Sequence, residues 1–113
     1  MAEIIKSSKE LTKEQIYFLT KSKTAVKMAE CDGQVVDMEA WALYSDADYK
    51  TGEMKEILAI LTTEGETLVT VSDTFKRDFL DIVDIFGDEF RRVKVVTGKS
   101  NNNRTFVTCE YSR

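Results

Sequence analysis

The middle of the chain shows the residue pattern of three consecutive β-strands. Residues 35–44 are rich in β-branched and aromatic side chains, and residues 55–62 contain an uninterrupted apolar run. Residues 67–72 alternate between two faces, as a strand with different surroundings on its two sides does. The glycine-containing segment 64–66 predicts a tight hairpin, and the polar segment 45–53 predicts a loop.

A helix and a final pair of strands follow. Apolar side chains recur at helical spacing over residues 73–86, Ser72 can cap the start, and Gly87 stands where a helix commonly ends. The pattern then returns to that of strands over residues 90–97 and 104–111, with a polar, asparagine-rich turn between them.

The N-terminal part of the chain is less regular. Residues 1–11 are mostly polar and predict a flexible tail. Thr12 and Gln15 have the spacing of a capping box, in which each side chain satisfies a backbone N–H of the other residue, so a helical segment is expected to begin there. We expect one domain over residues 12–113.

The order of these elements predicts the fold. We expect a mainly β protein with helices: a five-stranded OB-fold-like barrel with strand order β-β-β-α-β-β, preceded by an N-terminal helical segment. An OB-fold carries its helix between the third and fourth strands, which is where residues 73–86 lie. The alternative is an open α+β sheet with one helix on its face.

Length and composition fit one small globular domain. The chain has 113 residues, of which 42% are apolar and 32% are charged. The N-terminal residues lack the apolar run of a signal peptide, and no segment approaches the ~20 apolar residues of a membrane span. We therefore expect a cytoplasmic protein without membrane contact, in which Cys31 and Cys109 are reduced and buried.

The sequence argues against catalysis. It contains no histidine, which removes the Ser-His-Asp and Cys-His arrangements and the commonest metal ligand. Two distant cysteines do not make a zinc site. Residues 98–100 resemble the end of a P-loop, but Val93 stands where that motif needs glycine, and a strand is expected to follow instead of a helix. We expect no enzymatic activity, no metal and no cofactor.

Charge is distributed unevenly along the chain. Residues 1–29 carry six lysines against three glutamates, residues 30–90 carry sixteen acidic residues against four basic ones, and residues 91–113 carry six basic residues against one glutamate. A net charge of -4 therefore conceals two basic ends, which can form a basic face on an acidic protein. The alternative interpretation is an ordinary solvated surface.

A basic face beside aromatic side chains suits single-stranded nucleic acid. In an OB-fold the ligand crosses strands two and three, between the loop that joins strands one and two and the loop that joins strands four and five. Cations there neutralise phosphates, and aromatic rings stack on bases of any identity. The candidate residues are Tyr44, Tyr49, Lys50, Thr70, Ser72, Arg92, Lys94, Lys99, Arg104 and Phe106.

These candidates have different expected roles. The lysines and arginines are expected to contact phosphate, the hydroxyls of Thr70 and Ser72 to hydrogen-bond phosphate or sugar, and the aromatic rings to stack. The alternative for Tyr44 and Phe106 is that they are buried in the core, which is where Trp41 is expected.

An acidic protein-interaction module is the alternative function. The helix over residues 73–86 and the residues after it carry a cluster of carboxylates, namely Asp78, Asp81, Asp84, Asp88 and Glu89. Such an array can imitate DNA toward the basic cleft of another protein and so inhibit it. This alternative predicts a basic protein partner and no affinity for DNA.

Four short segments together resemble a known family. They are residues 19–22 (LTKS), 70–75 (TVSDTF), 98–100 (GKS) and 104–109 (RTFVTC). They are similar to segments of small single-stranded DNA-binding proteins of bacteriophages that infect Gram-positive bacteria. The resemblance extends over most of the chain from about Leu11 onward.

The resemblance implies an OB-type fold, no enzymatic activity, and a role in phage DNA replication or recombination in the host cytoplasm. It implies that Lys99 and Arg104 contact the DNA backbone and that Thr70 and Ser72 belong to the ligand face. The partners it implies are single-stranded DNA and proteins of replication or recombination. A monomer and a homo-oligomer both stay open.

Overall fold

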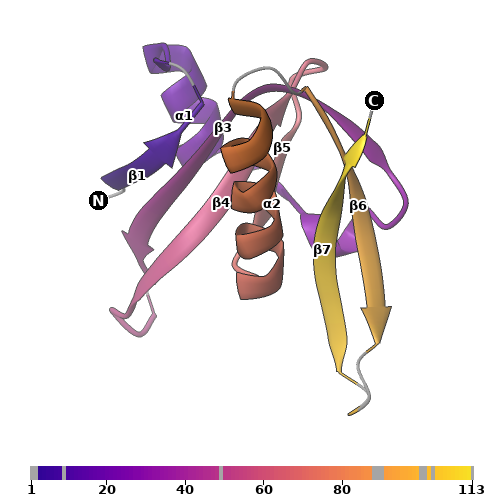
Figure 1. Cartoon of the computed structure of the whole chain (residues 1–113). Helices are drawn as coiled ribbons and strands as arrows, with labels where there is room; N and C mark the ends of the chain where they lie inside the picture. Colours follow the sequence, from indigo (N-terminus) through magenta and orange to yellow (C-terminus); the bar gives the residue numbers. More distant parts are fainter. Residues whose placement is uncertain are drawn as a thin grey trace.

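The structure, a computed structural model, describes residues 3–8, 10–48, 50–87, 91–99, 102 and 104–112 (Figure 1). The strands are β1 (Glu3–Ser7), β2 (Val26–Lys27), β3 (Val35–Ala47), β4 (Met54–Thr62), β5 (Thr67–Thr70), β6 (Arg92–Lys99) and β7 (Thr105–Ser112). The helices are α1 (Lys13–Lys21), the short 3-10 helix η1 (Met28–Glu30) and α2 (Asp73–Phe86). The fold is therefore mixed α/β, with more strands than the five predicted.

Strand β3 joins the two parts of the sheet. The strand order is β2-β5-β4-β3-β6-β7, with β1 added on β3. The first residues of β3 (Val35–Asp37) pair with β6, and the rest of the strand pairs with β4. The sheet curls into a half-barrel, and α2 stands between the β3–β4 part and the β6–β7 hairpin (Figure 1).

The concave side of the half-barrel contains the larger core. Phe75 and Phe79 of α2 are completely buried, and Phe79 meets Trp41 of β3 edge-on, with ring centroids 5.2 Å apart. Because side chains alternate between the two faces of a strand, β6 and β7 each turn every second residue toward this core, including Val93 and Val95. Trp41 is in the core as predicted, and so are both cysteines, which are free and buried.

The convex side of β3, β4 and β5 carries a second, smaller core beneath α1. Leu19 is its buried helix residue, and it packs with small side chains on the strands, such as Ala40, Ala42 and Ala59. Small side chains let a helix approach a sheet closely. The capping box predicted for this helix is present: Gln15 N–H donates to Thr12 Oγ1 at 3.1 Å, and Thr12 N–H donates to Gln15 Oε1 at 3.0 Å.

Helix α2 has the bounds that the sequence predicted. The Ser72 hydroxyl caps its first turn by accepting the N–H of Phe75 at 3.2 Å. At the other end, Gly87 has a φ of 63°, a conformation that glycine adopts without strain, and its N–H donates to Val83 O.

The N-terminal prediction was wrong, because residues 3–7 are not a flexible tail. They form β1, which pairs antiparallel with β3 and places Ile4 opposite Tyr44. The physical reason is that β6 pairs with the first part of β3 only, which leaves N–H and C=O groups along the rest of that edge to be satisfied.

Several predicted strand ends also needed correction. Strand β3 continues to Ala47, where a loop was expected from residue 45, because its last residues pair with β4. Strand β5 ends at Thr70, two residues earlier than predicted, and the N–H of Ser72 is bonded to the Thr70 Oγ1 atom instead of to a neighbouring strand. Strand β6 extends to Lys99 and shortens the predicted turn.

Candidate nucleic-acid interface

A groove of about 510 Å³ opens where the convex face of the sheet meets the β6–β7 hairpin. Apolar atoms make up most of its lining. It is lined by Ala25, Lys27, Met28, Ala29, Tyr44, Ile57, Val69, Thr70, Val71, Ser72 and Val107. These residues come from β2 and the residue before it, from η1, β3, β4 and β7, and from β5 and the residues that follow it.

Strand register explains the floor of the groove. Tyr44 of β3 is opposite Ile57 of β4, and Ala59 of β4 is opposite Val69 of β5. Because successive side chains of a strand point to opposite faces, these residues share the face that α1 covers farther along the strands. The floor is therefore the part of this face that α1 leaves uncovered.

Tyr44 forms the aromatic part of the floor. Its side chain is 5% exposed, so the ring is held firmly and presents only a small surface to a ligand. Burial, with a smaller effect of the Asp46 carboxylate, raises the pKa of the Tyr44 phenol. The phenol therefore stays neutral at physiological pH and adds no negative charge to the groove.

Two exposed residues flank this floor. Lys27 lies opposite Val69 because β2 pairs with β5, and its exposed side chain places a cation at the rim. Val71 follows β5 and is 57% exposed, so it adds open apolar surface to the lining of the groove.

Thr70 and Ser72 also line the groove, but other contacts occupy their hydroxyls. Thr70 Oγ1 accepts the N–H of Ser72 at 3.1 Å, and Thr70 is 9% exposed. Ser72 Oγ accepts from Phe75 N–H and donates to Val107 O at 3.1 Å. Since a hydroxyl has one hydrogen to donate, Ser72 has none left for a phosphate.

The β6–β7 hairpin extends the groove wall beyond Val107. Val107 is paired with Thr97, and the next pair on the same face is Lys99 with Thr105. Lys99 is exposed, and exposed Arg104 directly precedes β7. The structure thus brings these two predicted cations to the end of the hairpin wall.

Phe106 lies on the other face of the same hairpin. It is paired with Gly98, and its side chain is 38% exposed. Its ring is therefore accessible, but it does not share a strand face with Lys99.

Arg92 and Lys94 are farther from the groove and have acidic neighbours. Arg92 Nε lies 3.5 Å from Asp37 Oδ2, and Lys94 is directly opposite Glu110 on β7. These pairs leave less net positive charge along this part of β6 than the sequence predicted.

The turn between β3 and β4 is organised by Asp48. Its Oδ1 accepts the N–H of Lys50 at 2.8 Å, and its Oδ2 pairs with Lys55 Nζ at 3.0 Å. The backbone N–H of Lys50, followed by Lys55, holds the pKa of the Asp48 carboxyl below its usual range. Lys50 is exposed at this turn, and Tyr49 lies outside the described residues.

The acidic side of α2 is partly neutralised. Asp78 accepts a hydrogen bond from the Thr108 hydroxyl and pairs with Arg77, and Asp84 lies 3.9 Å from Lys6 Nζ. Asp81 is exposed. Asp88 and Glu89, the remaining members of the predicted cluster, lie outside the described residues.

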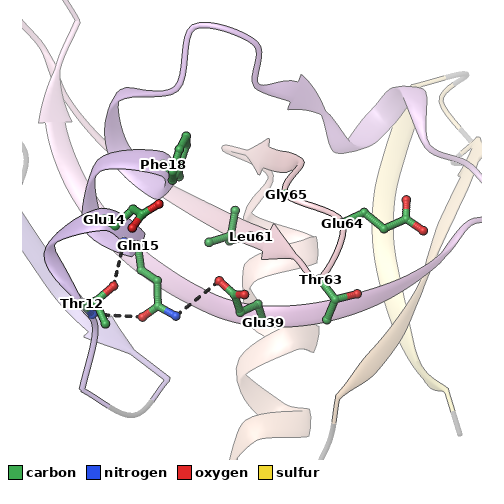
Figure 2. Close-up of a pocket in the computed structure, with 9 residues that line it drawn as sticks. All are labelled: Thr12, Glu14, Gln15, Phe18, Glu39, Leu61, Thr63, Glu64 and Gly65. Atoms are coloured by element: carbon green, nitrogen blue, oxygen red, sulfur yellow. Dashed lines mark hydrogen bonds between the residues drawn. The ribbon is translucent and has the colours of Figure 1, made fainter.

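A second pocket, between α1 and the β4–β5 turn, has the opposite electrostatic character (Figure 2). Its lining includes the carboxylates of Glu14, Glu39 and Glu64, and the Glu39 carboxylate accepts a hydrogen bond from Gln15. Phosphates are repelled by such a lining. The groove on the Tyr44 side, by contrast, has no carboxylate among the described residues that line it.

The part of the chain that the structure describes contains neither a candidate metal site nor a membrane-spanning helix. It brings no three His, Cys, Asp or Glu side chains together as a metal site. Neither of its α-helices has the length and apolar character needed to span a membrane.

Non-catalytic proteins that bind single-stranded nucleic acid combine cations that face the phosphates with aromatic or apolar surface that meets the bases, and this groove has both kinds of group. Comparison with known families makes this specific. Residues 2–112 match the Phi29 phage single-stranded DNA-binding protein family, and the chain belongs to that family. The predictions of a phage single-stranded DNA-binding protein without enzymatic activity are confirmed. Neither the curated proteins nor the solved structures include a match.

Sequence reasoning missed part of this groove. Lys27, Ile57, Val69 and Val71 line it but were not among the predicted site residues. The alternation of residues 67–72 did indicate two faces, but the pattern alone carries no sign of which face meets a helix and which meets a ligand.

Proposed function

We propose that this protein binds single-stranded DNA, with little regard to base sequence, in the groove floored by Tyr44, Ile57 and Val69. The observation that carries the proposal is the combination of this apolar strand face with Lys27 at one rim and Lys99 on the hairpin wall. Bases would pack on the apolar floor, and phosphates would face the cations.

The proposal includes an OB-type architecture for the domain. In its support, β3 pairs with both β4 and β6, β6 pairs with β7, and α2 separates β5 from β6 along the chain. The face of the second and third strands and the loops at its two ends bind oligonucleotides in OB-folds. Those strands correspond to β4 and β5, and the two loops correspond to the β3–β4 turn and the β6–β7 hairpin.

The predicted site residues take graded roles in this proposal. Lys99, Arg104 and Lys50 would contact phosphates, and Arg92 and Lys94 would add a weaker, longer-range attraction because acidic groups lie beside them. Tyr44 would pack against a base, and the exposed ring of Phe106 would stack on bases that pass beyond the floor. Tyr49 is proposed for the same stacking role on the sequence alone. Thr70 and Ser72 would shape the edge of the groove.

The biological setting that we propose is phage DNA replication or recombination in the cytoplasm of the host. There the protein would cover displaced single strands and would meet other proteins of those processes. Assembly into a homo-oligomer belongs to the same proposal, because a single OB domain covers only about 4–16 nucleotides.

Charge reversal at the hairpin tests the location of the site. Lys99→Glu and Arg104→Glu are both at exposed positions, so the fold should be unaffected. Each should weaken binding of oligo-dT and make its salt dependence shallower by roughly 0.7 in the log–log slope. Arg77→Glu, which makes the same charge change on exposed α2, is the matched control and should change binding much less. If both hairpin reversals leave binding intact, the proposed site is wrong.

A further inference from the structure

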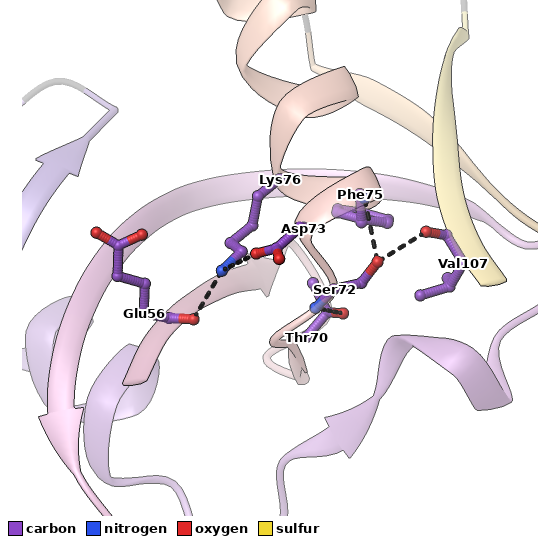
Figure 3. A network of polar contacts seen from close by, with 7 residues as sticks. All are labelled: Glu56, Thr70, Ser72, Asp73, Phe75, Lys76 and Val107. Carbon is purple, nitrogen blue, oxygen red and sulfur yellow. Dashed lines mark hydrogen bonds and ion pairs between the residues drawn. The ribbon is translucent and has the colours of Figure 1, made fainter. Parts of the chain in front are cut away.

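The first turn of α2 makes polar contacts with two separate parts of the sheet (Figure 3). On one side, Ser72 Oγ donates to Val107 O of β7 at 3.1 Å. On the other side, Lys76 Nζ donates to Glu56 O of β4 at 3.1 Å. The start of one helix therefore holds β4 and β7.

These two strands belong to different sides of the groove: β4 contributes Ile57 to the floor, and β7 contributes Val107 to the hairpin wall. In the strand order, β4 and β7 are separated by β3 and β6, and among the described residues no ladder joins β5 to β7. Val107 lines the groove directly, and Glu56 precedes the floor residue Ile57. A change in the contacts of α2 would thus alter the distance between the floor and the hairpin.

The two contacts differ in exposure: the Ser72–Val107 bond is half-buried, and the Lys76–Glu56 bond lies at the exposed surface. The Lys76 side chain is 12% exposed and its ammonium also pairs with Asp73 Oδ1 at 3.1 Å, while Ser72 is half-buried. Because the Asp73 side chain is 99% exposed, water screens its ion pair with Lys76. The hydrogen bond to Glu56 O is therefore the contact that ties Lys76 to β4. The Ser72 contact is the better shielded of the two, and a shielded hydrogen bond is stronger than one at an open surface.

We propose that Ser72 and Lys76 are positioning residues for single-stranded DNA, because together they set the width of the groove. Neither residue needs to touch DNA in this role. The inference rests on the proposed function and assigns Ser72 a role different from the direct DNA contact that the sequence suggested.

A pair of substitutions separates groove positioning from general stability. Ser72→Thr keeps a hydroxyl that can cap α2 and donate to Val107 O, and oligo-dT affinity should stay within about twofold. Ser72→Ala removes both contacts, and affinity should fall about threefold to tenfold, the effect of one shielded hydrogen bond. The matched control is Thr12→Ala, which removes the cap of α1 and should cost a similar amount of thermal stability without changing affinity.

Lys76→Met provides an independent variant. It keeps the apolar stem and removes the ammonium, so the side chain can still pack while the contact to Glu56 O is lost. Affinity should again fall severalfold. Equal losses of affinity in Thr12→Ala and in the Ser72→Ala and Lys76→Met variants would overturn the proposal, because stability alone would then explain them.

A double-mutant comparison distinguishes positioning from direct contact. In a Lys99→Gln, Arg104→Gln background, the hairpin has lost the cations that Ser72 helps to position, so Ser72→Ala should weaken binding by less than about twofold. An undiminished effect in that background would mean direct contact between Ser72 and DNA and would overturn the proposal. If Ser72→Ala binds like the unaltered protein while the hairpin variant is weakened, this inference fails and the proposed function stands. If the unaltered protein itself does not bind oligo-dT, the proposed function fails.

Discussion

The ring of Phe106 lies directly over Gly98 on the neighbouring strand. The two residues are paired across the β6–β7 ladder, and a Cβ atom at Gly98 would come within 2.7 Å of Phe106 Cζ. The absence of a side chain at position 98 therefore provides the space that the ring occupies. This relationship fixes an accessible aromatic ring near the end of the proposed hairpin wall.

A methyl group at position 98 should displace that ring. We expect Gly98→Ala to lower the free energy of unfolding by about 1 kcal/mol, a typical cost of local overpacking. In a Phe106→Ala background the same substitution should cost nothing or should stabilise the strand, since alanine has less backbone entropy to lose than glycine. Denaturant unfolding of the two single variants and the double variant measures the coupling, and strict additivity would show that the two residues do not interact.

Val71 offers a test of the groove by charge, because its side chain is 57% exposed and should tolerate polar replacement. Val71→Lys should tighten oligo-dT binding about twofold to fivefold, and Val71→Glu should weaken it by a similar factor, as expected for one added surface charge. Ile85 on α2 is 75% exposed and lies away from the groove, so Ile85→Lys and Ile85→Glu are the matched controls. Anisotropy titrations should show affinity changes of opposite sign for the Lys and Glu variants at position 71, and much smaller affinity changes at position 85.

The aromatic floor predicts different results for two replacements of Tyr44. Tyr44→Phe should bind oligo-dT within about twofold of the unaltered protein. Tyr44→Leu should bind about threefold more weakly, since a ring that is 5% exposed offers a base only part of the ~1–3 kcal/mol of full stacking. The raised pKa of the phenol further predicts no change in affinity from Tyr44 ionisation between pH 7 and pH 9. Equal affinity of the Leu variant and the unaltered protein, in samples shown to be folded, would remove Tyr44 from the site.

Much of the fold could be predicted because its signals are local. The bounds of α2 follow from Ser72 at the cap, from the apolar spacing and from Gly87, all of which act within a few residues. The capping box of Thr12 and Gln15 is another such signal. By contrast, β1 could not be predicted, because its pairing depends on an edge of β3 that is distant in sequence.

The site was harder to predict because a site depends on which strand faces meet. The basic residues of the hairpin could be named from their charge, but the acidic partners of Arg92 and Lys94 come from other strands. Likewise, the hydroxyl of Ser72 looks like a ligand group in the sequence and is used by Val107 in the structure. Lys27 reaches the rim only through the short pairing of β2 with β5.

Because Cys109 is buried, we expect the protein to lose stability under alkaline conditions. Burial, with smaller effects of Asp78 and Glu110, raises the pKa of the Cys109 thiol from 9.0 to about 12. The unfolded chain loses this proton first, so the stabilising contribution is complete below pH 9 and is lost between pH 9 and about pH 12. The expected decline from this group is about 1.4 kcal/mol per pH unit.

The Cys109→Ala variant isolates that contribution. It should be less stable at pH 7 because it leaves a small cavity, but its stability should decline less steeply above pH 9 than that of the unaltered protein. Urea unfolding at several pH values measures both slopes. Parallel pH slopes for the two proteins would contradict the assignment of the alkaline loss of stability to the Cys109 thiol. As a separate check of burial, thiol reagents should label both cysteines slowly in the native protein and rapidly in urea.

The most direct test of the central claim is to map where DNA binds by following backbone amide chemical shifts during titration with an oligo-dT of about ten nucleotides, a length that suits one OB-type domain. The account predicts that the largest changes fall on the groove, at Lys27, Tyr44, Ile57, Val69 and Val71, and on Lys99 of the hairpin. The exposed side of α2 around Asp81 should change little. Changes concentrated on α2 or on the acidic pocket beside α1, with the groove unaffected, would contradict it.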